Sequence, residues 1–386
     1  MLPYGRQLID EADIAAVVDA LRSPFLTCGP LVARFEEALA ARVGAPFASV
    51  CSNGTAALHL AYAALGIGAG DEIITTPITF SATAAAAYYV GATVRLADVD
   101  PITGNIDVAS VETLIGPRTR AIAAVHLGGQ PADLDKLVAL AQRRGLRLIE
   151  DACHALGAEY HGRPIGSGAS DAVVFSFHPV KHITTAEGGA VLVRDAAIKR
   201  RVDRLRQHGI ERDPALMSAP PAGPWVYEVA ELGWNYRLSD LQCALGISQL
   251  AKLDRFVARR RELACVYRTA LAATFGDAVS PPAEFADRSS AYHLFAVAID
   301  FERFATTRAH VMTALSAAGI GTQVHYVPLF DHPLHRARCP GELSRPRPGA
   351  ARYYARTLSL PMFPAMTDDD VVQVVAELHR VLGDQP

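Results

Sequence analysis

The sequence contains very few lysines. Its 37 basic residues include four lysines, Lys136, Lys181, Lys199 and Lys252, and the others are arginines. Beyond Arg259–Arg261 it has no dense basic block, and its formal net charge is −3. A nucleic-acid partner is therefore not expected, and each lysine stands out as a rare choice in this chain.

Long apolar runs are also missing. No stretch approaches the ~20 uncharged apolar residues that a membrane-spanning helix needs, although 50% of the residues are hydrophobic. Asp10, Glu11 and Asp13 interrupt the region in which an export signal would have its apolar segment. We therefore expect a cytoplasmic protein without a membrane partner.

Metal and redox motifs are absent from the sequence. The cysteines show no C-x-x-C spacing, so we expect reduced thiols. His178 and His182 are four residues apart, and His332 and His335 are three apart. A proline interrupts the helical spacing in each pair, and no carboxylate completes either set. We expect no metal site.

Short apolar runs alternate with amphipathic stretches between residues 47 and 195. We expect strands at 47–51, 72–75, 93–97, 121–126, 146–150, 172–177 and 190–193. The helices expected between them are 55–65, 79–89, 107–115 and 133–144. This order predicts an α/β fold with a mostly parallel central sheet.

The remainder of the chain indicates a smaller α+β unit. Residues 213–224 are rich in Pro and Gly and predict an irregular loop, and a long helix follows from Ser239 towards Leu271. A strand at 293–299 and helices at 306–318 and 368–382 complete the pattern. We predict a large α/β domain over residues 1–240, and a linking helix with a small C-terminal α+β domain over 241–386.

Lys181 lies in the segment Phe175-Ser-Phe-His-Pro-Val-Lys-His-Ile-Thr-Thr-Ala-Glu-Gly-Gly, between two predicted strands. Apolar and small neighbours desolvate the amine, which lowers its pKa and makes it nucleophilic. This environment suits a lysine that forms a Schiff base. The alternative is a surface lysine whose stem covers apolar neighbours, and the segment by itself does not decide between them.

Two other places offer partners for such chemistry. Asp151 and His154 follow the predicted strand 146–150, at the edge where α/β sheets bind ligands. A carboxylate there suits a protonated pyridine nitrogen, although Asp151 equally fits a helix cap. The turn Ser52-Asn-Gly-Thr55 opens a helix whose N–H groups suit a phosphate, with Ser176 as a further hydroxyl. A plain Asn-Gly turn is the alternative.

These segments, with Gly233-Trp-Asn-Tyr-Arg-Leu-Ser-Asp240, resemble the DegT/DnrJ/EryC1/StrS sugar aminotransferases, a family of fold-type I pyridoxal-phosphate enzymes. The resemblance runs from Tyr4-Gly-Arg-Gln to Leu360-Pro-Met. Residues 178–190, 207–213 and 323–329 are most similar to the pseudaminic-acid-pathway branch. The fold that this implies is a large domain with a mostly parallel sheet and a smaller C-terminal α+β domain.

The resemblance implies the following site. Pyridoxal 5'-phosphate is linked covalently to Lys181, with Asp151 at its pyridine nitrogen and His154 near its ring oxygen. Further implied cofactor contacts are those of Gly54, Thr55, Ser176, Phe80, which stacks on the ring, and Asn235 of a neighbouring subunit. Implied substrate contacts are those of Tyr4, Arg237, His325 and Tyr326. The site would thus span a homodimer.

The implied reaction moves an amino group from L-glutamate to the C4 ketone of a UDP-linked 4-keto-6-deoxy-HexNAc sugar. Its product would be a 4-amino-4,6-dideoxy sugar nucleotide of a pseudaminic acid type pathway. A dTDP-linked sugar or a C3 ketone is an open alternative. Dehydratases of the family carry histidine in place of the lysine, so Lys181 argues against that branch.

The residues leave two other functions to compare with this one. The run Gly66-Ile-Gly-Ala-Gly70 faintly resembles a nicotinamide dinucleotide loop, but it follows a helix and lacks the spacing of that motif. A non-catalytic regulator or binding protein can share an enzyme's fold. The joint presence of Lys181, Asp151, His154 and Thr55 argues against it, and an absorbance scan of the purified protein would distinguish the two.

Overall fold

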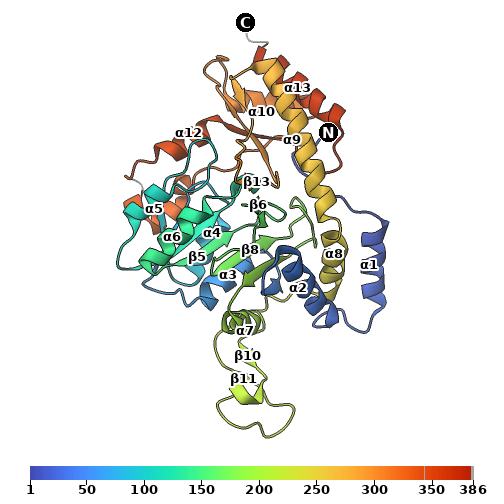
Figure 1. Ribbon diagram of the computed structural model, residues 1–386, viewed down its shortest axis with the longest axis vertical. Coiled ribbons are helices and arrows are strands. Elements are labelled where there is room, and N and C mark those ends of the chain that lie inside the picture. The colour runs from blue at the N-terminus through green and yellow to red at the C-terminus, as the bar shows by residue number, and fades with distance from the viewer. Residues whose placement is uncertain (343, 384–386) are drawn as a thin grey trace.

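The computed structural model describes residues 1–342 and 344–383 (Figure 1). At its centre is a seven-stranded sheet with the strand order β1-β9-β8-β5-β4-β2-β3. In that order the strands are β1 (Phe47–Cys51), β9 (Gly189–Val193), β8 (Ala172–Ser176), β5 (Arg147–Asp151), β4 (Thr119–Val125), β2 (Glu72–Thr75) and β3 (Thr93–Leu96). Only β9 is antiparallel to its neighbours within this described sheet. The predicted α/β fold with a mostly parallel sheet is confirmed.

Helices cover both faces of this sheet because the strand side chains alternate between two sides. Ala121 and Ala123 of β4 belong to the core beneath α3 (Gly54–Ala64) and α4 (Ala82–Tyr89). Ile122 and Ala124 belong to the core beneath α5 (Val108–Leu114) and α6 (Leu134–Arg144). The helix predicted at 79–89 begins three residues later, at Ala82, and residues 79–81 line a cavity instead.

Two further helices, α2 (Pro30–Val43) and α7 (Ala196–Leu205), pack against the first strand. The helix α1 (Glu11–Arg22) packs instead against α8 (Asp240–Leu250) at the periphery (Figure 1). The single helix predicted from Ser239 is divided into α8 (Asp240–Leu250) and α9 (Leu253–Phe275). The break lies at Lys252, whose amine binds the buried carboxylate of Asp13 on α1 at 2.8 Å.

The C-terminal part forms a second, smaller sheet. Its strands are β12 (Val279–Ser280), β14 (Phe295–Ile299) and β15 (Thr357–Leu360), and its helices are α10 (Arg308–Ala317) and α13 (Asp368–Gly383). Together with α9 they enclose a separate apolar core. Shorter elements lie in the connections between these strands and helices: β6 (Glu159–Tyr160), β7 (Arg163–Pro164), β13 (Arg288–Ser289), η1 (Leu127–Gly129), η3 (Leu329–Asp331), α11 (Pro333–Arg338), η4 (Pro340–Glu342) and α12 (Pro348–Arg356). The boundary between two domains near residue 240 stays a prediction.

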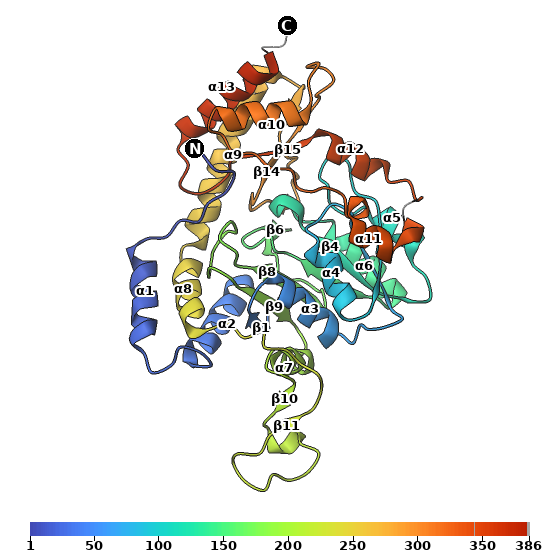
Figure 2. The same ribbon diagram turned by 180° about the vertical axis from the view of Figure 1, so that it is seen from behind.

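A hairpin projects from the body of the molecule, as the two opposite views show (Figures 1 and 2). It consists of β10 (Ile210–Glu211) and β11 (Glu228–Val229), and the segment predicted to be irregular lies at its tip with the short helix η2 (Pro214–Leu216). Its exposed apolar side chains are those of Leu216, Trp225, Tyr227, Val229 and Leu232. We call residues 207–235 the arm.

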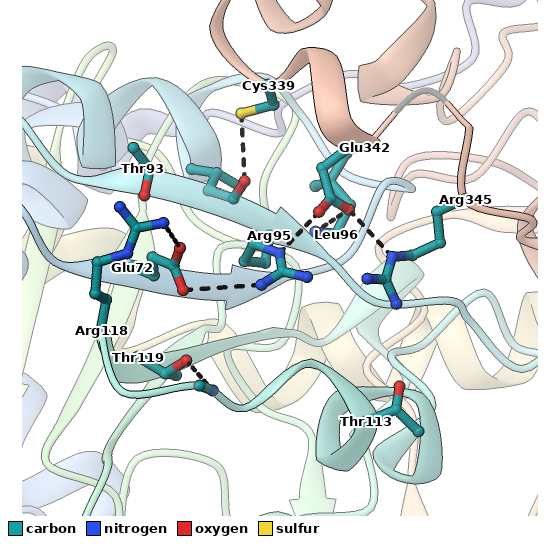
Figure 3. Close-up of polar contacts among 12 residues, drawn as sticks. Glu72, Thr93, Arg95, Leu96, Thr113, Arg118, Thr119, Cys339, Glu342 and Arg345 are labelled. Carbon is teal, nitrogen blue, oxygen red and sulfur yellow. Dashed lines mark hydrogen bonds and ion pairs between the residues drawn. The ribbon is translucent and has the colours of Figure 1, made fainter.

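The edge strand β3 is covered by side chains instead of another strand (Figure 3). Alternate residues of a strand point their N–H and C=O groups to the same side, so Val94 and Leu96 face the open edge. The Cys339 thiol donates to the Val94 carbonyl at 3.2 Å, and the Leu96 N–H donates to the Glu342 carboxylate at 3.3 Å. The Arg347 guanidinium donates to the Leu96 carbonyl at 2.9 Å. This edge is therefore protected from pairing with another chain.

Buried ion pairs hold the covering segment in place. The Glu342 carboxylate accepts from Arg95 Nε at 2.8 Å and also pairs with Arg347. Glu72 on β2 pairs with Arg118 at 2.7 Å (Figure 3). Both carboxylates are buried and each is neutralised by arginine, although of these arginines only Arg347 is itself buried, while Arg95 is half-buried and Arg118 is exposed.

None of the helices in the described ranges is long and apolar enough to cross a membrane.

Candidate active site

A cavity of about 1200 Å³ opens where β4, β5 and β8 end, at Val125, Asp151 and Ser176. Carboxyl ends of parallel strands are the usual place for a ligand in this architecture. The predicted site residues that line the cavity are Tyr4, Gly54, Thr55, Phe80, Asp151, His154, Ser176, Lys181, His325 and Tyr326. Segments from most of the chain thus meet at one site.

Lys181 reaches the cavity from the turn that follows β8. Its backbone N–H donates to the His178 carbonyl at 2.8 Å, and Thr184 Oγ1 donates to the Phe177 carbonyl at 3.0 Å, so the turn is fixed by its own hydrogen bonds. Burial of the amine lowers the pKa of Lys181, an effect that the charges of Cys153 and Asp151 oppose. A lowered pKa increases the fraction of uncharged, nucleophilic amine.

Asp151 is the last residue of β5 and is buried. Thr83 on α4 donates to Asp151 Oδ2 at 2.7 Å, and the Cys153 N–H donates to Oδ1 at 3.3 Å. Thr79 in turn bonds the Thr83 hydroxyl at 2.8 Å. The carboxylate is therefore held in a fixed orientation at the floor of the cavity and can accept a further hydrogen bond from a cationic ring nitrogen.

The turn before α3 has the features of an anion site. Asn53 caps the helix by accepting from the Ala56 N–H at 2.8 Å. The first N–H groups of a helix have no partner inside it, and together with the helix dipole they favour an anion. A Cβ at Gly54 would lie 2.9 Å from the Ser176 Cβ, so glycine allows the turn to approach the end of β8. The Ser176 hydroxyl and the N–H groups then face the same space.

His154 and Tyr326 form one wall of the cavity. The Gly128 N–H donates to His154 Nδ1 at 3.3 Å, and His154 Nε2 lies 3.2 Å from the Tyr326 hydroxyl. Burial holds the pKa of His154 well below its usual range. Because Nδ1 accepts, the single proton of the neutral ring belongs on Nε2, which donates to Tyr326.

Tyr4 and His325, for which substrate contacts are predicted, lie next to each other in the cavity lining. Their ring centroids are 5.6 Å apart. His325 Nδ1 is 2.8 Å from the Ser359 hydroxyl, and burial lowers the pKa of His325 to about 3. This histidine is therefore neutral at physiological pH.

Asn235 and Arg237 are not brought to this cavity by their own chain. Asn235 is exposed at the base of the arm and pairs with Gln207, while the carbonyl of Tyr236 accepts from the Ser52 N–H at 2.8 Å. Arg237 is half-buried and is not among the lining residues. The prediction that both act from a neighbouring subunit stays a prediction.

Several residues of the site were not predicted from the sequence. Thr83 orients Asp151, and Tyr89, His332 and His335 line the cavity. His293 lies 3.5 Å from the Lys181 amine. The spacing of His332 and His335 suggests no role other than metal binding, and in the ranges 1–342 and 344–383 no group of three or more His, Cys, Asp or Glu residues is placed to hold a metal.

The arrangement combines a buried amine, a fixed carboxylate and an anion turn around one cavity. Such a set can bind a phosphorylated aromatic ring by its phosphate and its ring nitrogen and present the amine to it. The same amine can take up and return protons once it is uncharged.

Comparison with known proteins gives consistent results over the full chain. A profile of the "DegT/DnrJ/EryC1/StrS aminotransferase family" matches residues 7–379. The spore coat polysaccharide biosynthesis protein SpsC of Bacillus subtilis (strain 168) is 41% identical over 382 residues, which cover 99% of this chain and 97% of that protein.

Two solved structures have similar folds. The Helicobacter pylori protein PseC, an aminotransferase involved in the biosynthesis of pseudoaminic acid, has a TM-score of 0.92 with 31% identity and 100% coverage of both chains. The PLP form of the putative sugar aminotransferase Spr1654 from Streptococcus pneumoniae has a TM-score of 0.89 with 27% identity, covering 99% of this chain and 98% of that one.

Proposed function

The chain belongs to the DegT/DnrJ/EryC1/StrS aminotransferase family, and on that premise we propose which amino transfer it performs. It is a sugar aminotransferase that depends on pyridoxal 5'-phosphate, so it uses an amino donor and a sugar substrate. The proposed donor is L-glutamate, and the proposed acceptor is the C4 ketone of a UDP-linked 4-keto-6-deoxy-HexNAc sugar. The observation that carries this proposal is the single cavity in which Lys181, Asp151 and the turn at Gly54 meet.

The residues of the cavity fit the cofactor. Gly54, Thr55 and Ser176 would hold the phosphate at the start of α3. Glycine at position 54 allows the helix start and Ser176 to come this close, because a larger residue would collide with Ser176. The buried Asp151 carboxylate would pair with the ring nitrogen, and Lys181 would form the covalent link. Phe80, His154 and, from a neighbouring subunit, Asn235 would complete the contacts with the ring and phosphate.

When bound, pyridoxal 5'-phosphate supplies a ring that takes up the electron pair released as a proton leaves the carbon bearing the amino group. Asp151 keeps the ring nitrogen protonated by holding a negative charge beside it. The released Lys181 amine would take the proton from that carbon and deliver it to C4' of the cofactor, for which the amine must start uncharged. Burial of the amine, which lowers the pKa of Lys181, favours this state.

A nucleotide-linked substrate would need cations that this cavity lacks. Among the described residues that line it, Lys181 is the sole lysine or arginine, and a diphosphate is best bound by arginine. We therefore assign Arg237 of a second protomer to the diphosphate, and Tyr4, His325 and Tyr326 to the sugar. The exposed apolar side chains of the arm support a contact with that protomer.

Substitution of Lys181 tests the proposal. Lys181→Ala should abolish the absorbance of the lysine-linked cofactor and lower the transamination rate by roughly 10³-fold or more, because no other amine is in reach. Absorbance scans and a glutamate-dependent assay of the purified protein measure both. Lys136→Ala is the matched control, because this lysine is exposed and pairs only with Asp133 at 2.7 Å. A Lys181→Ala protein that keeps both properties would refute the role of Lys181.

The sugar is the second point to test. The 41% identity to SpsC exceeds the 31% identity to PseC, so the substrate assay should also include nucleotide sugars other than the proposed acceptor. Candidate UDP- and dTDP-linked sugars with a C4 or C3 ketone should be compared, with products identified by mass. A dTDP-linked or C3-keto substrate with a higher kcat/KM than the UDP-linked C4 ketone would replace the proposed acceptor.

A further inference from the structure

His293 lies beside the Lys181 amine. It lies two residues before β14, and its Nε2 is 3.5 Å from Lys181 Nζ. The ring is buried and its centroid lies 4.2 Å from that of His154. Its other nitrogen, Nδ1, has no hydrogen-bond partner within the described part of the chain. Among the described residues, Lys181 is therefore the one hydrogen-bond partner of the His293 ring.

The backbone around His293 is held in a strained conformation by several contacts. Tyr292 has φ 46°, a left-handed value that costs energy for a residue other than glycine. The fully buried Arg260 donates through Nη1 to the carbonyls of Tyr292 at 3.1 Å and His293 at 3.3 Å. Strain maintained in this way near a cavity is typical of a functional position.

A close approach of two loops adds to this support. The Ala291 N–H donates to the Gly129 carbonyl at 3.1 Å, and the Leu294 N–H donates to the Gly128 carbonyl at 3.1 Å. A Cβ at Gly129, which has φ 95°, would lie 2.8 Å from the His154 carbonyl oxygen and 3.0 Å from the His293 nitrogen. The loop that bonds His154 therefore also fixes His293.

The His293 ring is uncharged in this environment. Burial holds the pKa of His293 well below its usual range, and the positive charges of Lys181 and Arg260 lower it further. A neutral imidazole has one N–H and one lone pair, whereas an amine always carries N–H groups. With the proton on Nδ1, the Nε2 lone pair is an acceptor for Lys181.

We propose that His293 is a positioning residue whose Nε2 accepts a hydrogen bond from the Lys181 amine whenever that amine is not bonded to the cofactor. This inference rests on the proposed role of Lys181. The bond keeps the released amine within the cavity and orients its lone pair for proton transfer. Lys181 is also faced by Asp151, Cys153, His154, His182 and His325. In the described structure, none of these side chains is hydrogen-bonded to the Lys181 amine.

His293→Phe and His293→Gln separate the hydrogen bond from packing. Phenylalanine keeps an aromatic ring beside His154 but has no acceptor, whereas glutamine places a polar amide near the position of Nε2. His379→Asn, at an exposed position on α13, is the control. Excess L-glutamate is added to each holoenzyme and then removed, which leaves the amino group on the cofactor and the Lys181 amine free.

Two quantities are then measured. The pKa of the free Lys181 amine follows from its rate of reductive methylation against pH, read by mass spectrometry on its peptide. The single-turnover rate with L-glutamate is measured as a function of donor concentration. For His293→Phe we expect a lower pKa of Lys181, because the ammonium loses an acceptor, and a maximal rate about tenfold lower at an unchanged half-saturating concentration. His293→Gln should restore both, and His379→Asn should change neither.

The outcomes are distinct. An unchanged or raised pKa of Lys181 in His293→Phe overturns the proposal, and so does a glutamine variant that behaves like the phenylalanine one. If His293→Phe does not fold, His293→Asn replaces it, because its shorter amide does not reach Lys181 and must show the loss that glutamine avoids. A wild-type protein whose absorbance does not respond to L-glutamate contradicts the proposed donor instead, and the pKa of Lys181 is then measured after removal of the cofactor.

Discussion

Buried histidines surround the cavity, and burial keeps them uncharged. It lowers the pKa of His59 to about 4 and of His325 to about 3, and it holds the pKa values of His154, His182 and His293 well below their usual range. In an unfolded chain a histidine takes up a proton below its ordinary pKa of about 6.5. The folded protein therefore binds fewer protons than the unfolded one in weak acid.

Acid should accordingly destabilise the fold. Where the unfolded state binds more protons, the free energy of unfolding rises with pH, so it should fall as pH decreases below about 6.5. The limit is about 1.4 kcal/mol per pH unit for each such histidine until its folded pKa is reached. Urea unfolding at pH 7.0, 6.0 and 5.5 measures this dependence. His325→Asn should reduce the slope by one histidine's share, and an unaltered slope would contradict the assignment of His325 as neutral.

Among single residues, the sequence predicted those that belong to short contiguous motifs. Asp151 and His154 follow one strand, and Lys181 follows the next, so their common cavity was predictable from the order of strands. Thr83 and His293 act on Asp151 and Lys181 from segments 68 and 112 residues away. Such contacts arise from tertiary packing, and no local pattern in one sequence indicates them.

The cover of the edge strand β3 combines several elements of the fold. Glu342 accepts from the Leu96 N–H and neutralises Arg95 and Arg347 from a buried position. A buried carboxylate between two arginines leaves uncompensated charge when it is removed. The same stretch of chain carries His332 and His335, which line the cavity. The stability of the sheet edge and the shape of the cavity wall are therefore linked.

Glu342→Gln should destabilise the protein by about 3 kcal/mol, because the buried Arg347 loses its counter-charge and the half-buried Arg95 keeps only the longer contact with Glu72. Urea unfolding measures the loss, and faster hydrogen exchange of the Leu96 amide locates it. Glu112→Gln is the control: its side chain is 45% exposed and pairs with Arg143 and Arg144, so the expected change is within about 1 kcal/mol. Equal effects of the two substitutions would contradict a special role of the β3 edge.

Whole elements were predictable where burial gives a regular pattern. The seven central strands were predicted because most of them are short apolar runs buried on both faces, as in β2 and β9. The helices α1 and α2 were not predicted, and α1 gains its buried charge, Asp13, only by packing against α8 and Lys252. The helix expected from Ser239 is divided at the same lysine. Strands of two residues, such as β10 and β11, are too short to show a period.

At the scale of the molecule, the arm is the feature that the rest of the protein does not explain. Trp225 is 72% exposed and Leu232 is 84% exposed. Glu231 ties the base of the arm to Arg201 and Arg204 on α7, at 3.1 Å and 2.5 Å. The arm is thus anchored at its base while its apolar side chains face outward, which suits a surface that a second copy of the chain covers.

Hybrid dimers test whether Arg237 acts across that contact. Lys181→Ala and Arg237→Glu should each inactivate a homodimer. If each site uses Lys181 of one protomer and Arg237 of the other, a hybrid has one intact site, so random mixing should restore about a quarter of wild-type activity. Co-expression with two different tags and a glutamate-dependent assay measure this recovery. No recovery in verified hybrids would place both residues in the same protomer's site.

The cover of β3 also has a consequence during synthesis of the chain. Glu342 and Leu96 are 246 residues apart, so the ribosome completes the sheet edge only near the end of translation. At about 5–20 residues per second the edge is open for roughly 12–50 s. Nascent and prematurely terminated chains therefore expose unpaired strand groups, and chains that stop before Glu342 should be the ones that aggregate or need a chaperone.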